Sequence, residues 1–243
     1  MRVDVLAIGP HPDDIELCIC GTLLKLIDRG KTVVIADLTR GEMGTHGAEQ
    51  IRLREASEAA SRMGVCERVN LNLGDGIISD NLNNRIKIVE LIREFRPSIV
   101  MTNYWDDLHP DHSIAGQLVA KCSFLAGLLK YPASKKHYRP REVLHYMSHY
   151  SFVPTFIVDT TQYFEKKLDV LGAYSSQFKS FEAYNFGESA RQDFKKFFHA
   201  IEIKDRYYGS CIRCSFGEPF FVKKALPMND PVDHFLDPDL QRR

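Results

Sequence analysis

Four times within the first 130 residues, a short β-branched or apolar run is followed by a segment with helical character. This alternation is typical of βα units, whose strands lie parallel in one sheet and whose helices cover both faces. The crossovers in such units are right-handed. The pattern therefore predicts an α/β fold with a Rossmann-like, doubly wound and mostly parallel sheet.

The expected elements are bounded by turn residues. Gly30 and Gly64 close the first two helices, and Pro97 opens the fourth strand. Apolar residues spaced for one face of a helix support the third helix. The expected strands lie at 3–8, 32–38, 68–73 and 97–102, and the expected helices at 15–29, 50–63, 85–95 and 113–130.

The second half is less regular. Its pattern predicts strands at 143–150 and 155–159, a helix at 161–173, and helical character at 188–206, before an irregular tail after Pro227. No repeat or linker interrupts the chain. We therefore expect one domain over residues 1–243, with a core at 1–130 and a less regular part at 131–243.

Composition limits the function classes. The formal net charge of +0 gives no broad basic surface, so nucleic acid is not an expected partner. No apolar stretch approaches the roughly 20 residues that span a bilayer, and the first residues do not resemble a secretory leader. Six cysteines are compatible with reduced thiols. We expect a cytoplasmic protein without membrane association.

Two polar clusters each follow a predicted strand. The first holds His11, Asp13 and Asp14, and the second is the run His109-Pro110-Asp111-His112. Loops at the carboxyl ends of parallel strands can open on the same edge of a sheet. Two histidines and a carboxylate with an open position suit zinc, although ferrous iron (Fe2+) takes the same ligand types. The clusters therefore predict a metal site, with a spare carboxylate and a spare imidazole for proton transfer and oxyanion stabilisation.

Each of these residues also has a plainer interpretation. Asp13 or Asp14 alone would serve as a helix cap, and a lone histidine beside a helix start is usually structural. Residues 41–47 contain three glycines and could suggest a nucleotide loop, but their spacing matches neither dinucleotide nor P-loop motifs. The convergence of the two clusters favours the metal site. Chemistry alone does not distinguish Asp13 from Asp14 as ligand and base.

The two clusters resemble the paired signatures of the LmbE-like, or PIG-L type, zinc-dependent de-N-acetylases. Residues 38–45, Arg52 with Glu55-Ala56, and the run Asn72-Leu73-Gly74-Asp75-Gly76 resemble the branch that acts in bacillithiol biosynthesis. That branch removes the acetyl group from N-acetylglucosaminyl malate, a small molecule. The resemblance is dense over residues 1–125 and patchy up to about 224.

The resemblance implies a role for each motif residue. His11, Asp14 and His112 would hold the zinc ion, and Asp13 would be the general base. His109 would stabilise the oxyanion or protonate the leaving amine. Asp111 would orient an imidazole. Contacts with the substrate would come from Arg52, Asp75 and Glu42.

Several alternatives stay open at this point. The substrate could be another N-acetylglucosamine conjugate, such as a mycothiol-type glycoside, a chitooligosaccharide or an antibiotic precursor. A non-catalytic sugar- or nucleotide-binding protein is the remote alternative. If the substrate carries malate, its carboxylates need a cation, for which Arg40, Arg52 and Arg141 are candidates. Relatives commonly form symmetric assemblies, so we expect a homo-oligomer.

Overall fold

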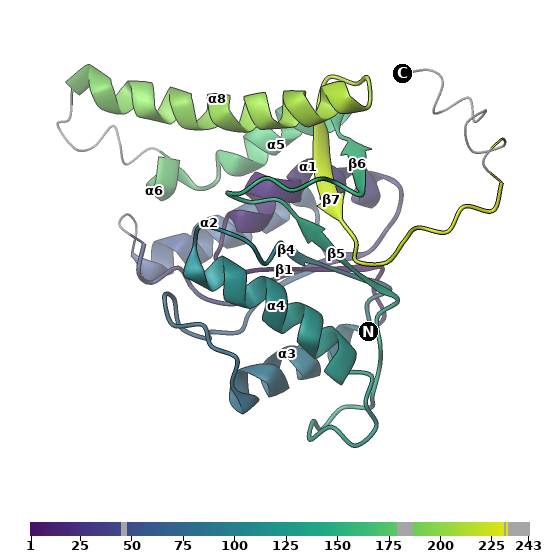
Figure 1. The fold of residues 1–243 in the computed structure, drawn as a ribbon. Helices are drawn as coiled ribbons and strands as arrows, with labels where there is room; N and C mark the ends of the chain where they lie inside the picture. Colours follow the sequence, from purple (N-terminus) through teal and green to yellow (C-terminus); the bar gives the residue numbers. More distant parts are fainter. Residues whose placement is uncertain (45–47, 179–186, 231, 233–243) are drawn as a thin grey trace.

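The predicted βα alternation forms one seven-stranded sheet in this computed structural model, with helices on both faces (Figure 1). The strand order is β3-β2-β1-β4-β5-β7-β6. Strands β1 to β5 are parallel, and β7 runs antiparallel to both of its neighbours. The structure describes residues 1–44, 48–178, 187–230 and 232. The predicted doubly wound, mostly parallel α/β class is confirmed.

The elements follow one another along the chain in this order: β1 (Val5–Gly9), α1 (Asp14–Asp28), β2 (Val33–Asp37), α2 (Glu49–Met63), β3 (Glu67–Asn70), α3 (Leu82–Phe95), β4 (Ile99–Asn103), α4 (Pro110–Leu125), β5 (Glu142–Tyr146), β6 (Phe156–Asp159), a 3-10 turn (Thr161–Tyr163), α5 (Phe164–Leu171), α6 (Ser175–Phe178), α8 (Gly187–Cys211) and β7 (Gly217–Phe221).

Side chains alternate between the two faces of the sheet along each strand, so one hydrophobic core forms on each face. In β1, Val5 and Ala7 face α1 and α2, whereas Leu6 and Ile8 face α3 and α4. All four side chains are buried, as expected for a strand covered on both faces. Helix α8 lies beyond α5, on the same side of the sheet as α1 (Figure 1). The predicted βα units thus supply helices on both faces, and α5 and α8 add to the layer that contains α1.

Two differences from the predicted elements matter for the site. Helix α4 begins at Pro110 rather than near residue 113, so the second polar cluster occupies its first turn. Proline fits this position because its missing N–H would have no partner within the helix. Strand β7 was not expected, because Pro219 cannot donate to a sheet ladder and usually excludes a central strand.

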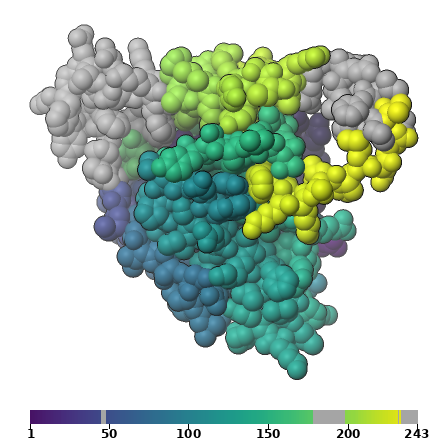
Figure 2. All heavy atoms as spheres, viewed as in Figure 1, coloured from purple at the N-terminus to yellow at the C-terminus, as the bar shows by residue number. Residues whose placement is uncertain are grey.

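The chain after β7 leaves the sheet. Its residues 223–230 are exposed, and in the space-filling view this yellow segment runs over the surface (Figure 2). The predicted irregular tail after Pro227 falls mostly outside the described residues.

Helix α1 is kinked at Ile19, where φ is −137°. The kink leaves backbone N–H groups of the second half without partners inside the helix. Glu218 of β7 accepts hydrogen bonds from two of them, at 3.0 Å from Gly21 N and 2.7 Å from Thr22 N. Its carboxylate also contacts Lys167 Nζ at 2.9 Å, and Lys167 reaches Asp205 at 2.7 Å. This buried cluster therefore ties α1, α5 and α8 to the last strand.

Replacing Lys167 with Met should lower the free energy of unfolding by about 3–5 kcal/mol, since two buried carboxylates would lose their cation. The side chain of Lys167 is 1% exposed, and the side chains of its partners Asp205 and Glu218 are 0% exposed. The neighbouring Lys166 is 49% exposed and pairs with exposed Asp169, so Lys166→Met is the matched control and should cost less than about 1 kcal/mol. Guanidinium unfolding of the two variants measures the difference. Equal losses would contradict a structural role for the buried cluster.

Candidate metal and catalytic site

Both predicted polar clusters lie where the strand order reverses. Strands β1 and β4 are neighbours and parallel, and the chain leaves β1 toward β2 and β4 toward β5. Ligands of open α/β sheets bind at such a switch point, beyond the carboxyl ends of the strands. His11 follows β1, and His109 and His112 follow β4. Residues about 100 positions apart therefore meet at one edge.

His11, Asp14 and His112 form a compact set of donors. Asp14 Oδ2 lies 3.1 Å from His11 Nδ1 and 3.3 Å from His112 Nε2, and all three residues are buried. Zinc bonds of about 2.0–2.1 Å in a tetrahedron place ligand atoms about 3.3 Å apart. The donor types and spacing therefore fit a zinc ion, with a position left for water or substrate.

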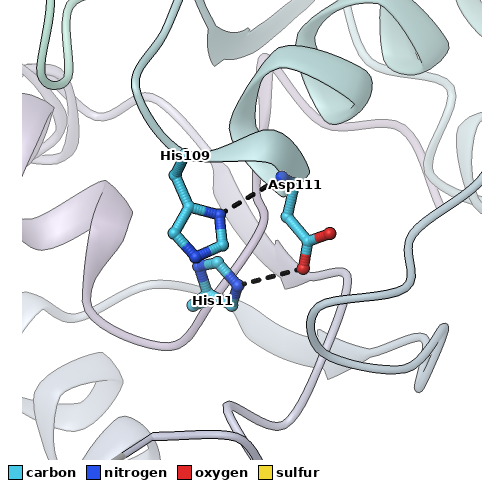
Figure 3. A group of neighbouring side chains, drawn as sticks. All are labelled: His11, His109 and Asp111. Atoms are coloured by element: carbon cyan, nitrogen blue, oxygen red, sulfur yellow. Dashed lines mark hydrogen bonds and ion pairs between the residues drawn. The ribbon is translucent and has the colours of Figure 1, made fainter.

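The imidazole of His11 is fixed from its other side by two carboxylates. Its Nε2 lies 2.9 Å from Asp75 Oδ1. The same nitrogen lies 3.4 Å from Asp111 Oδ2, a contact drawn as a dashed line in Figure 3. Asp111 is itself held, because its carboxylate accepts N–H groups of Gly76 at 2.7 Å and Ile78 at 3.3 Å. Such outer carboxylates orient a ligating imidazole and raise its basicity.

His112 has a corresponding support, which the two sequence motifs do not reveal. Its Nδ1 lies 3.3 Å from Asp107 Oδ1 and 3.1 Å from Ser148 Oγ. His149, which lies outside both polar clusters, places its Nδ1 2.8 Å from the same Asp107 oxygen. The position of Asp107, two residues before His109, was a usable signal. Ser148 and His149 gave none, since the fold brings them there from the loop after β5.

Burial and nearby charges act in opposite directions on the pKa values of His11 and His112. Burial alone would lower the pKa of His11, but hydrogen bonds to Asp111, Asp14 and Asp75 outweigh it and raise that pKa to about 12. Burial alone would also lower the pKa of His112. The carboxylates of Asp14 and Asp107 outweigh burial and raise that pKa to about 9. The cluster therefore attracts positive charge, and a divalent cation would take the place of these protons.

Asp13 precedes α1 in a strained backbone conformation. Its φ of 111° is unusual for a residue with a side chain, and its carboxylate does not cap the helix. Instead, Arg52 Nη2 donates to Asp13 Oδ2 at 3.1 Å and to Pro12 O at 2.7 Å. Burial raises the pKa of Asp13 to about 7, against the opposing charge of Arg52. A carboxylate with such a pKa is suited to accept a proton near neutral pH.

His109 caps α4 through its ring. Its Nδ1 accepts the N–H of Asp111 at 3.2 Å, which places the proton of the neutral ring on Nε2 (Figure 3). Burial and the charges of His11 and His112 lower the pKa of His109. The ring lies edge-on to His11, with centroids 4.9 Å apart. A neutral imidazole in this tautomer can donate a hydrogen bond into the site.

The three residues expected to contact substrate lie at the same edge but already have partners. Arg52 is buried against Asp13 and Gly41, and Asp75 bonds to His11 and to the N–H of Met43. Glu42 is exposed and accepts the N–H of Asp75 at 2.9 Å. The contacts therefore connect Arg52 to Asp13 and Asp75 to His11, and the contact of either residue with substrate stays a prediction.

The three arginines that could bind the malate carboxylates differ in position and in burial. Arg141 precedes β5 and bonds to Ser98 before β4, so it lies at the opposite edge of the sheet. Arg52 is buried. Arg40 follows β2 at the edge that carries the site, where its partly exposed side chain pairs with Glu49.

Within the described residues, every helix is too short or too polar to cross a lipid bilayer.

Comparisons with known proteins find a family model, curated relatives and solved structures that resemble this chain. The PIG-L family model, described as GlcNAc-PI de-N-acetylase, matches residues 6–123, which include both clusters. Diacetylchitobiose deacetylase of Thermococcus kodakarensis is 35% identical over 186 residues, covering 72% of this chain and 70% of that protein. A probable N-acetyl-alpha-D-glucosaminyl L-malate deacetylase 2 of Bacillus anthracis is 28% identical, covering 72% and 81%. A solved conserved protein of Thermus thermophilus superposes with a TM-score of 0.83 at 32% identity, covering 93% and 98%.

Proposed function

The chain belongs to the PIG-L family of de-N-acetylases, and we propose that it hydrolyses the acetamide of N-acetylglucosaminyl malate, as in bacillithiol biosynthesis. It is a hydrolytic de-N-acetylase of N-acetylglucosamine-type substrates. The observation that carries the proposal is the set of two imidazoles and one carboxylate at the switch point, beside a second carboxylate held by Arg52. Zinc, in preference to ferrous iron, is the proposed cofactor.

In this proposal, His11, Asp14 and His112 hold the ion through one nitrogen or oxygen each. When bound, zinc supplies a Lewis acid that polarises a carbonyl oxygen and makes water acidic enough to ionise near pH 7. Asp111 and Asp75 behind His11, and Asp107 behind His112, keep the two rings in place.

Asp13 is the proposed general base. It takes a proton from the attacking water, and Arg52 fixes the direction in which the carboxylate points. His109 then donates a hydrogen bond from its Nε2–H to the negative charge that develops on the acetamide oxygen, and it keeps that proton. The departing amine receives the proton that Asp13 took from the water. Acetate and the free glucosaminyl amine are the products.

The malate part of the substrate would bind Arg40. A dicarboxylate requires a cation near the site, and Arg40 lies next to Gly41, whose carbonyl accepts Arg52 Nη1 at 3.3 Å. A chitooligosaccharide is the second candidate substrate, favoured by the higher identity to the diacetylchitobiose deacetylase. That substrate carries no carboxylate, so Arg40 separates the two alternatives.

Replacing Arg40 with Ala should raise KM for N-acetylglucosaminyl malate by about ten- to a hundredfold, the effect of losing a charge-assisted hydrogen bond of about 1.5–3 kcal/mol. KM for N,N'-diacetylchitobiose should change little. Arg141→Ala is the matched control, because Arg141 is exposed at the opposite edge. An equal rise for both substrates would contradict carboxylate recognition by Arg40.

Acetate release from three substrates tests the function itself. Metal-stripped and zinc-reconstituted protein are compared on N-acetylglucosaminyl malate, N,N'-diacetylchitobiose and N-acetylglucosamine, with Fe2+ reconstitution under nitrogen as a parallel arm. Zinc-dependent release that is fastest from the malate conjugate is the expected result. Preference for diacetylchitobiose would move the protein to the second candidate, and no release from any of them would overturn the proposal.

A further inference from the structure

We propose that Asp107, Ser148 and His149, with the outer nitrogen of His112, form a second zinc site that binds more weakly than the first and inhibits the enzyme. The inference rests on the proposed zinc site of His11, Asp14 and His112, but not on the identity of the substrate. It concerns the opposite edge of the His112 ring from the one that faces Asp14.

The four donor atoms lie in a closed ring. Asp107 Oδ1 is 2.8 Å from His149 Nδ1 and 3.3 Å from His112 Nδ1. Ser148 Oγ is 3.1 Å from His112 Nδ1 and 3.2 Å from His149 Nδ1. These separations are close to the roughly 3.3 Å between ligand atoms around tetrahedral zinc. Imidazole nitrogens and a carboxylate oxygen are also the ligand types that zinc prefers, so a few tenths of an ångström of expansion would admit the ion.

Backbone N–H groups hold the four donors on the Asp107 side, and the His149 side is exposed to solvent. The Asp107 side chain is 1% exposed and is anchored by N–H groups of His109 at 3.0 Å and His149 at 3.1 Å. The His149 side chain is 46% exposed. An ion can therefore reach the donors from the His149 side, without passing through the first site.

Two features make this site weaker than the first. A serine hydroxyl is a poor zinc ligand compared with imidazole or carboxylate, and His112 would be shared between two cations. When the second ion binds, His112 Nδ1 releases its proton to solvent and its lone pair forms the new bond. The second site should therefore bind zinc clearly more weakly than the first.

Inhibition follows from the position of Asp107. In the structure this carboxylate accepts from His112 and so orients the proposed ligand of the first ion. A second cation would take that carboxylate and draw electron density from the shared imidazole. The first ion would then be held in an altered arrangement, and turnover should fall severalfold at zinc concentrations well above those that restore activity.

The test is equilibrium dialysis against increasing zinc, with metal counted by plasma mass spectrometry. The native protein should reach two zinc ions per chain in two separate steps, whereas His149→Ala should stop at one. His199→Ala is the matched control, since His199 is a 67% exposed histidine of α8 that lies 3.8 Å from Glu202 and outside both polar clusters. Ser148→Ala should weaken the second step more than the first, because its hydroxyl is a ligand of the second ion but only an outer contact of His112. In parallel, acetate release in excess zinc should fall for the native and His199→Ala proteins but not for His149→Ala.

Saturation of the native protein at one zinc ion would overturn the second site, whatever its activity. Two ions in both the native and His149→Ala proteins would overturn the ligand assignment. Two ions without loss of turnover in excess zinc would overturn the inhibitory role. If the protein binds two ions as described but releases acetate from no substrate, the proposed function fails and the second site stands.

Discussion

Replacing Asp13 with Asn should lower kcat by about a thousandfold. With one equivalent of zinc supplied, the variant should still contain one ion per chain. The amide cannot accept the proton of the attacking water, and general acid–base groups typically contribute 10²–10⁴-fold. Asparagine is the appropriate substitution because it matches aspartate in size and tolerates the positive φ of 111° at this position. Loss of activity would then report the missing base rather than a changed backbone.

The measurements are the initial rate of acetate release and the zinc content of the same preparation. Asp106→Asn is the matched control, because this exposed aspartate lies in the motif loop next to Asp107. It should retain nearly full turnover. A kcat of Asp13→Asn within about tenfold of the native value would refute Asp13 as the base, and loss of zinc would instead make it a ligand.

Replacing His11 with Ala should have the larger effect. It removes one of three proposed ligands of the first site, so at one equivalent of zinc both zinc content and acetate release should fall to background. It also removes the group that faces Asp14, Asp75 and Asp111, leaving these buried carboxylates without their shared partner. We therefore expect a lower melting temperature as well.

Metal analysis and far-UV circular dichroism separate loss of the ligand from loss of the fold. His137→Ala controls for histidine removal at an exposed position. His112→Asn removes the ligand contributed by α4 and should give the same metal loss from the other side of the site. A folded His11→Ala protein with a full complement of zinc would contradict the ligand assignment.

The sequence was most informative where periodicity decides the structure. Apolar alternation in β1 and β2 and glycine stops such as Gly64, which adopts a φ of 78°, define the βα units. Strand β7 escaped prediction because Pro219 weakens its pattern, while pairing with β5 and β6 stabilises it. That pairing is tertiary, and no local signal reports it.

The same division holds in the site. That His11, Asp14 and His112 lie together was predictable, because each sits in a short run of polar residues between a strand and the helix that follows it. The contacts of Asp107 with His149 span 42 residues and depend on how the loops after β4 and β5 meet. The bond from Arg52 to Asp13 spans 39 residues and gives that arginine a neighbour that a motif cannot reveal. Roles that depend on partners distant in sequence therefore needed the fold.

Glu218 also sets the order in which the newly made protein can be completed. Its carboxylate accepts the N–H of Gly21, a residue made 197 positions earlier. At a synthesis rate of about 5–20 residues per second, the two are separated by about 10–40 seconds on the ribosome. During that interval the N–H groups of Gly21 and Thr22, in the second half of α1, lack their acceptor Glu218. The first turn of the same helix carries Asp14. We therefore expect a nascent chain shorter than about 217 residues to lack a finished metal site, even though it already contains every residue of the two motifs.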